Sequence, residues 1–142
     1  MSLDEVKKRF VEEVKLRAYD DKYVDKGEER EILQIAIQQS IPLENARAAL
    51  AQVCESNSYV LESSVLKQIK DLMDTFATND GKIDEKEFTD AVTTCKKATK
   101  GKRTDVQCKK MVLEIMEDNT YKPKTGMFSN WHAKARKDVG MA

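Results

Sequence analysis

Two acidic phrases, 59 residues apart, hold the side chains of this chain that are best suited to chemistry. They share the pattern Asp-x-x-(Val/Ile)-Asp-x-x-Glu, and each leads into a stretch with helical periodicity. Carboxylate oxygens are the ligands that hard divalent cations such as Ca²⁺ prefer. The phrases therefore predict either divalent-cation sites or two helix starts. The candidate metal ligands are Asp21, Asp25, Glu28, Asp80, Asp84 and Glu87.

The second phrase matches the second half of an EF-hand calcium loop. When Gly81 is aligned with the glycine of that loop, Asp84 and Glu87 fall on its last two ligand positions. The first half departs from the pattern, because Phe76 stands where the loop needs its first carboxylate. The first phrase has Arg17 at that position, and its positive charge would repel a cation. We therefore expect at most a weak or non-standard divalent site, at the second loop.

Helix capping is the alternative explanation of both phrases, and it needs fewer assumptions. Asp25 and Asp84 each have a glutamate three residues later, which is the spacing of a capping box. Such a cap satisfies backbone N–H groups and complements the helix dipole, and it contributes about 1 kcal/mol. The apolar residue before each acid suits a hydrophobic staple, and Gly81 suits a tight turn. The pattern favours helix starts over metal sites.

The elements around the phrases are predicted to be helices. Apolar residues recur at helical spacing along most of the chain, and no segment alternates with period two. We predict an all-α fold, a compact bundle of six to seven helices built on two helix-loop-helix units. The predicted helices cover residues 3–19, the stretch from the 20–25 turn to a break at 40–42, then 43–55, 62–77, 85–100, 104–117, and a short helix capped by Ser129.

Local signals add detail to some of these segments. Ile35 and Ile37 help to make the second helix apolar over much of its circumference, so we expect that helix to be central to the core. Thr104 and Gln107 are spaced as a further capping box. Residues 59–61 are too short to assign, and residues 119–126 are expected to be an irregular link.

The first phrase and the two helical stretches after it resemble the TerB-like helical domain of tellurite-resistance proteins. The similar residues are Asp20-Asp-Lys-Tyr-Val-Asp25-x-x-Glu28, Ile32-Leu-x-Ile-Ala36 and Ile41-Pro-Leu-Glu-Asn-Ala46-x-x-x-Leu50. With the second phrase, the resemblance covers residues 16–92, about half of the chain. It implies a duplicated, non-enzymatic helical module in which the acidic positions of the two phrases, Asp20 included, are where a cation would sit. Lys22 departs from the family, which favours glycine there.

The bulk properties are those of a charged globular protein. The chain has 142 residues, of which 40% are hydrophobic and 35% charged, and we expect one domain with a duplicated core at 16–92 and a basic helical extension at 96–142. Its three cysteines, Cys54, Cys95 and Cys108, lie far apart in helical patterns, as expected of buried free thiols in a reducing compartment. No apolar run is long enough to span a membrane and no signal peptide is present, so we predict a cytoplasmic protein.

Charge is distributed unevenly along the chain. Residues 1–95 hold 13 basic and 20 acidic side chains, a net −7, whereas residues 96–142 hold 12 basic and 5 acidic ones, a net +7. Such asymmetry indicates an acidic or nucleic-acid partner, or two halves that complement each other. The candidate partner-binding residues are Lys96, Lys97, Lys100, Lys102, Arg103, Lys109, Lys110 and Trp131.

The sequence does not indicate an enzyme. His132 is the only histidine and has no partner at a recognisable spacing, and no catalytic or phosphate-binding motif is present. We expect a non-enzymatic interaction or scaffold module of TerB-like type with an unidentified protein partner. It requires no cofactor, but weak binding of Ca²⁺ or another divalent cation stays open. The alternatives are a calcium-responsive EF-hand-like protein, and a protein that binds nucleic acid or an acidic partner through its basic C-terminal region.

Overall fold

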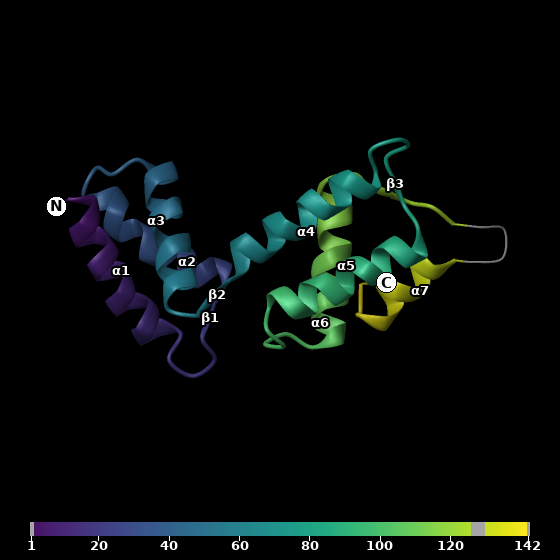
Figure 1. Cartoon of the computed structure of the whole chain (residues 1–142). Coiled ribbons are helices and arrows are strands. Elements are labelled where there is room, and N and C mark those ends of the chain that lie inside the picture. Colours follow the sequence, from purple (N-terminus) through teal and green to yellow (C-terminus); the bar gives the residue numbers. More distant parts are fainter. Residues whose placement is uncertain (1, 126–129, 142) are drawn as a thin grey trace. The chain divides into compact units, whose positions relative to one another are not determined.

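The computed structural model describes residues 2–125 and 130–141 and confirms the all-α prediction (Figure 1). Over these residues the helices are α1 Leu3–Arg17, α2 Lys26–Gln38, α3 Leu43–Ser56, α4 Glu62–Phe76, α5 Glu85–Ala98, α6 Asp105–Asp118 and α7 Trp131–Asp138. Four two-residue strands lie between them, β1 Tyr23–Val24, β2 Val60–Leu61, β3 Lys82–Ile83 and β4 Lys122–Pro123. Ser129, the predicted cap of the last helix, lies outside the described residues.

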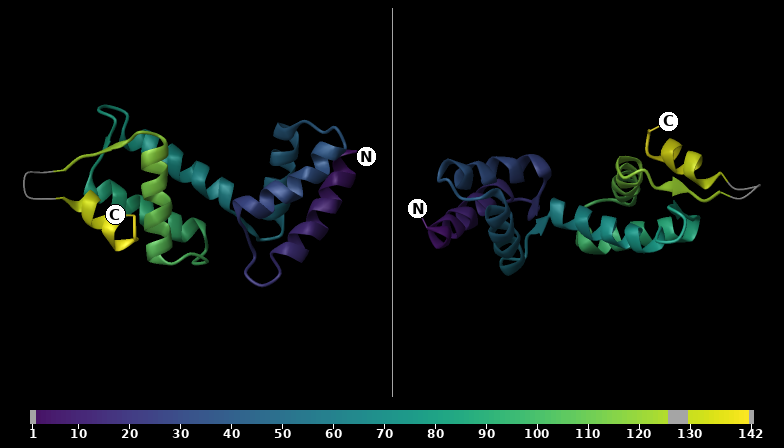
Figure 2. Two further views of the ribbon diagram at one scale, coloured as in Figure 1. Left: turned by 180° about the vertical axis from the view of Figure 1, so that it is seen from behind. Right: turned by 90° about the horizontal axis from the view of Figure 1, so that it is seen from above.

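The chain divides into two compact units, Met1–Ser64 and Val65–Ala142, with the boundary in the first turn of α4. In the second unit α6 packs on α5 and α7 packs on α6, because the inner faces of α6 and α7 are apolar. Figure 2 shows α7, in yellow, beside α6 in this unit.

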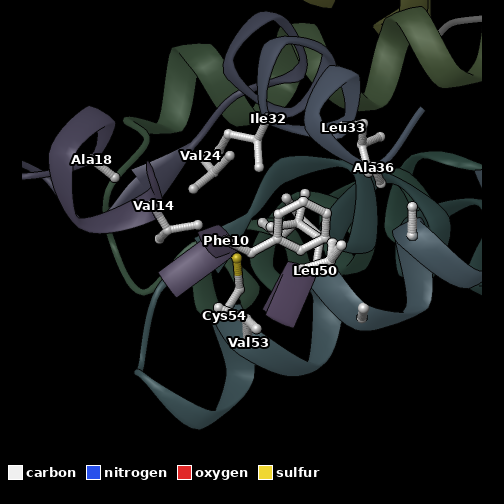
Figure 3. Packing of buried hydrophobic residues seen from close by; sticks show 14 residues of the cluster. Phe10, Val14, Ala18, Val24, Ile32, Leu33, Ala36, Leu50, Val53 and Cys54 are labelled. Atoms are coloured by element: carbon white, nitrogen blue, oxygen red, sulfur yellow. The ribbon is translucent and has the colours of Figure 1, made fainter. Parts of the chain in front are cut away.

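The first unit is built around one face of α1. Val6, Phe10 and Val14 are fully buried on that face, and α1 packs mainly on α3. Helix α2 closes this core, and Figure 3 shows Phe10 beside Leu50, with residues of all three helices around them. The buried cluster comprises Val6, Phe10, Val14, Ala18, Val24, Ile32, Leu33, Ala36, Ala46, Ala49, Leu50, Val53, Cys54 and Leu61.

The second unit repeats this plan with different side chains. Four buried residues of α1 and its C-cap correspond to buried residues 59 positions later, in α4 and just beyond it: Val6 to Val65, Phe10 to Ile69, Val14 to Met73 and Ala18 to Ala77. The buried positions of α2 correspond to buried positions of α5 at the same spacing: Ile32 to Ala91, Leu33 to Val92 and Ala36 to Cys95. After the interhelical turn the spacing becomes 62, which relates Leu50 to Val112 and Val53 to Ile115.

The short strands show that the repeat extends to β4 and that only α7 has no counterpart among the described elements of the first unit. β1 pairs with β2 in parallel, Tyr23 opposite Val60, and β3 pairs with β4 in parallel, Lys82 opposite Lys122. A residue with positive φ precedes β1 and β3 directly, Lys22 (54°) and Gly81 (70°). Ser58 and Thr120 take the same conformation two residues before β2 and β4. Asn57 and Asn119 each donate from Nδ2 to the carbonyl four residues back, at 2.8 Å. The twin phrases are therefore one part of a structural duplication that covers three helices and two short strands in each unit.

Candidate binding groove

Both acidic phrases form the predicted capping boxes. The backbone N–H of Glu28 donates to Asp25 Oδ1 at 2.8 Å, and that of Asp25 donates to Glu28 Oε1 at 3.2 Å. In the second phrase the corresponding distances are 2.7 Å to Asp84 Oδ1 and 3.0 Å to Glu87 Oε1. Burial, together with the neighbouring carboxylates of Asp25 and Asp21, raises the pKa of Glu28 despite the backbone hydrogen bond. The helix-start explanation of the phrases is confirmed.

The remaining acids of the phrases bind their own turns. Asp21 Oδ1 accepts from the N–H of Tyr23 at 3.1 Å, and Asp80 Oδ1 accepts from that of Lys82 at 3.0 Å. Asp80 Oδ2 lies 3.8 Å from Lys124 Nζ. Among the residues that the structure describes, no group of three or more Asp, Glu, His or Cys side chains is arranged to hold a metal ion. Cation binding by these carboxylates stays a prediction.

The basic candidates lie around the turn between α5 and α6. Lys97, Lys100, Lys102 and Lys110 are exposed, and Lys109 is half-buried. Lys96 donates to Asp105 Oδ1 at 2.7 Å, and this hydrogen bond raises the pKa of Lys96 and lowers that of Asp105. The turn presents positive charge to solvent, but part of that charge is already paired.

Trp131 is a core residue of the second unit. Its side chain is 6% exposed, its ring centroid lies 5.1 Å from that of Phe88, and its Nε1 donates to the carbonyl of Lys124 at 3.0 Å. Little of the indole is therefore open to a stacking partner. Contact between Trp131 and a partner stays a prediction, and the burial of its side chain gives that prediction no support. His132 packs edge-on against Trp131, and burial lowers its pKa.

The cysteines are buried free thiols, as predicted. Burial and, to a smaller extent, the charge of Glu29 raise the pKa of Cys54 to about 12. A thiol with so high a pKa is almost entirely protonated at neutral pH and is a poor nucleophile.

The first unit contains a groove that the sequence did not single out. It encloses about 350 Å³ between α2 and α3, next to the start of α4. Its floor is apolar, Leu33, Ile37 and Leu43, and its other lining residues are Lys26, Glu29, Arg30, Gln34, Arg47 and Ser63. Ile37 and Leu43 are 46% and 41% exposed.

The duplication shows what the second unit has in place of this apolar floor. Counted from the two capping boxes, Ile37 corresponds to Lys96. Leu43 and Asp105 are the first residues of α3 and α6, so they also correspond. In the second unit these two positions thus form the 2.7 Å Lys96–Asp105 ion pair, whereas the first unit exposes two large aliphatic side chains there.

The corresponding groove of the second unit is smaller and lies beside a helix. It encloses about 180 Å³, and four of its lining residues, Glu85, Phe88, Thr89 and Lys109, correspond to Lys26, Glu29, Arg30 and Arg47. Its other four lining residues belong to α7: Trp131, Lys134, Ala135 and Asp138. Trp131 and Ala135 are buried, so α7 already covers part of this surface.

The expectation that the second helix is central to the core was wrong for part of its apolar surface, and that part borders this groove. Ile37 was expected in the core, but it is exposed, and Ile35 is only partly buried. The helix is apolar over a wider arc than the first unit can bury, and this excess was the signal that could have revealed the groove.

Comparisons with known proteins leave the resemblance to TerB-like domains without support. No family model, no curated protein and no solved structure matches this chain.

Proposed function

We propose that this chain is a non-enzymatic helical interaction module of TerB-like type, and that its first unit binds a protein partner in the groove between α2 and α3. One observation carries the proposal: Ile37 and Leu43 are exposed at the positions where the second unit has an ion pair. Apolar side chains gathered in a groove with a polar rim mark protein-binding surfaces. A merely structural surface would tolerate the ion pair, as the second unit does.

The chemistry of the remaining groups supports binding over catalysis. Cys54 has a strongly raised pKa, and His132 packs against an indole, so neither is placed as a nucleophile or a general base. None of the described helices is long and apolar enough to cross a membrane. A cytoplasmic location, predicted from the free thiols, belongs to the same proposal.

Two other functions have less support. In a calcium-responsive protein, Asp84 and Glu87 would have to exchange their hydrogen bonds in the capping box for a cation, and calcium should then shift the amide NMR signals of residues 80–87. In a nucleic-acid-binding protein, the exposed lysines at the turn between α5 and α6 should give binding that falls steeply with salt. The proposal predicts neither effect.

The test is a selection of helical peptides, each of about 15 residues, from a displayed library with the folded chain as bait. Binders are then tested on the Ile37→Lys, Leu43→Asp double variant, which imports the residues of the second unit, and on Val106→Lys as a matched control. Val106 is 52% exposed on α6. We expect binders that the double variant loses and the control retains. Binders unaffected by the double variant, or no binders, would refute the proposal.

A further inference from the structure

We infer that the partner segment is an acidic amphipathic helix, with an apolar row along one face and Asp or Glu side chains beside it. This inference rests on the proposed function and specifies the chemistry of the partner. Three features support it: the shape of the groove floor, the charge of its rim, and the use that the second unit makes of its own groove.

The floor has the layout that a helical ligand needs. Leu33 and Ile37 are one turn apart on α2, and Leu43 joins them from the start of α3. Leu33 is 5% exposed and lines the groove together with these two exposed side chains. An apolar row running along a helix axis is complementary to apolar residues at positions i, i+3, i+4 and i+7 of a bound helix.

The rim of the groove is cationic. Lys26 and Arg30 are four residues apart on α2, and Arg47 is four residues after Leu43 on α3. None of these three cations forms an ion pair with a described residue. The one carboxylate of the lining, Glu29, is 8% exposed, and its Oε1 accepts a hydrogen bond from Ser63 Oγ at 2.9 Å.

This charge arrangement selects the partner. Two guanidinium groups that form no ion pair with a described carboxylate are suited to bidentate contacts with the carboxylates of a ligand. In the second unit Glu85 and Thr89 replace Lys26 and Arg30, and the two lysines that line that groove, Lys109 and Lys134, are matched in number by the carboxylates of Glu85 and Asp138. An excess of cations over carboxylates therefore accompanies the exposed apolar floor in the first groove and is missing from the lining of the second.

In the second unit a helix packs beside the corresponding groove. Its α7 lines the corresponding groove and buries Trp131 and Ala135 there. The α7 of a second copy is a poor occupant of the first groove, because its Lys134, Arg136 and Lys137 would face cations. A helix from a partner with the opposite charge meets both requirements.

The experiment uses two synthetic helical peptides with the same leucine face, one with glutamates beside that face and the other with lysines at the same positions. Binding to the full chain is measured by fluorescence anisotropy at low and at high salt. Because surface charge pairs are individually weak and act together here, we expect the acidic peptide to bind about tenfold more tightly at low salt, with the preference reduced by salt. The Arg30→Glu, Arg47→Glu variant should reverse the preference.

The outcomes separate this inference from the proposed function. Equal affinity for both peptides, abolished in each case by Ile37→Lys with Leu43→Asp, would overturn the acidic partner and leave the groove as a binding site. Affinity that this double variant does not change would overturn both. A wild-type dimer in sedimentation that the double variant converts to a monomer would assign the groove to a second copy of the chain and overturn a partner helix.

Discussion

The duplicated turns before β1 and β3 predict that substitutions at corresponding positions change the unfolding free energies of the two units in opposite directions. Lys22 and Gly81 hold corresponding positions with φ of 54° and 70°. This left-handed conformation costs a residue with a Cβ about 1–2 kcal/mol, whereas glycine adopts it freely. We predict that Lys22→Gly stabilises the first unit and that Gly81→Ala destabilises the second.

The magnitudes result from two opposing effects. A glycine in the unfolded chain has more conformations to lose, which offsets the relief of strain by about 0.4–1 kcal/mol. The net gain for Lys22→Gly is then about 0.5–1 kcal/mol, with a loss of similar size for Gly81→Ala. A Cβ placed on Gly81 meets no heavy atom within 4 Å, so the loss comes from the backbone alone.

Urea denaturation measures both changes. Trp131 is the only tryptophan, so its fluorescence reports the second unit, while circular dichroism reports helices of both units. Lys22→Ala is the matched control for the first turn, because it removes the charge and retains the Cβ, and its stability should equal that of the wild type. If Lys22→Gly leaves the unfolding free energy unchanged or lowers it, or if Lys22→Ala stabilises as much as Lys22→Gly, the backbone explanation is wrong.

Three further predictions concern the caps and the titratable groups. Asp25→Ala and Asp84→Ala should each lower the unfolding free energy in urea by about 1 kcal/mol, since each removes one side of a capping box; equal stability would show that the boxes contribute nothing. Cys54 should not react with a thiol reagent at pH 8 until the protein unfolds, because its pKa is raised to about 12, and Cys54→Ser should lower the number of slowly labelled thiols by one, since Cys95 and Cys108 are buried as well. Burial lowers the pKa of His132 below its ordinary value of about 6.5, so the unfolded state binds the proton first as the pH falls. The second unit should therefore be fully stabilised above about pH 6.5 and lose stability below it, and His132→Asn should flatten this dependence in thermal melts.

The local part of the fold was predictable from the sequence. Asp25, Asp84 and Thr104 begin helices α2, α5 and α6 as predicted, because a capping box is decided by residues three positions apart. The two-residue strands were not predicted. Their pairing joins segments about 40 residues apart, and neither Val60–Leu61 nor Lys122–Pro123 is long enough to show a periodicity.

The extent of the duplication was also hidden in the sequence. The twin phrases suggested a repeat over residues 16–92. The later segments of the two units, α3 to β2 and α6 to β4, share few identical residues with each other. Cys54 and Met116 fill corresponding core positions, for example, because a core requires apolar volume and not a particular residue. The asparagines at the C-caps of α3 and α6 were the remaining local sign of the repeat, and two asparagines 62 residues apart are too few to align.

The difference between the two units at the groove is the main argument for a binding role of the first unit. Most buried positions correspond between the two units and are apolar in both, with Glu29 opposite Phe88 as an exception. The surface positions between the second and third helices of each unit are not needed for folding, as the Lys96–Asp105 ion pair demonstrates. The first unit nevertheless has Ile37 and Leu43 there, with Arg30 and Arg47 beside them. Exposed aliphatic side chains on a surface that tolerates charge favour association in solution, so a partner that covers them accounts for their presence better than the stability of the unit does.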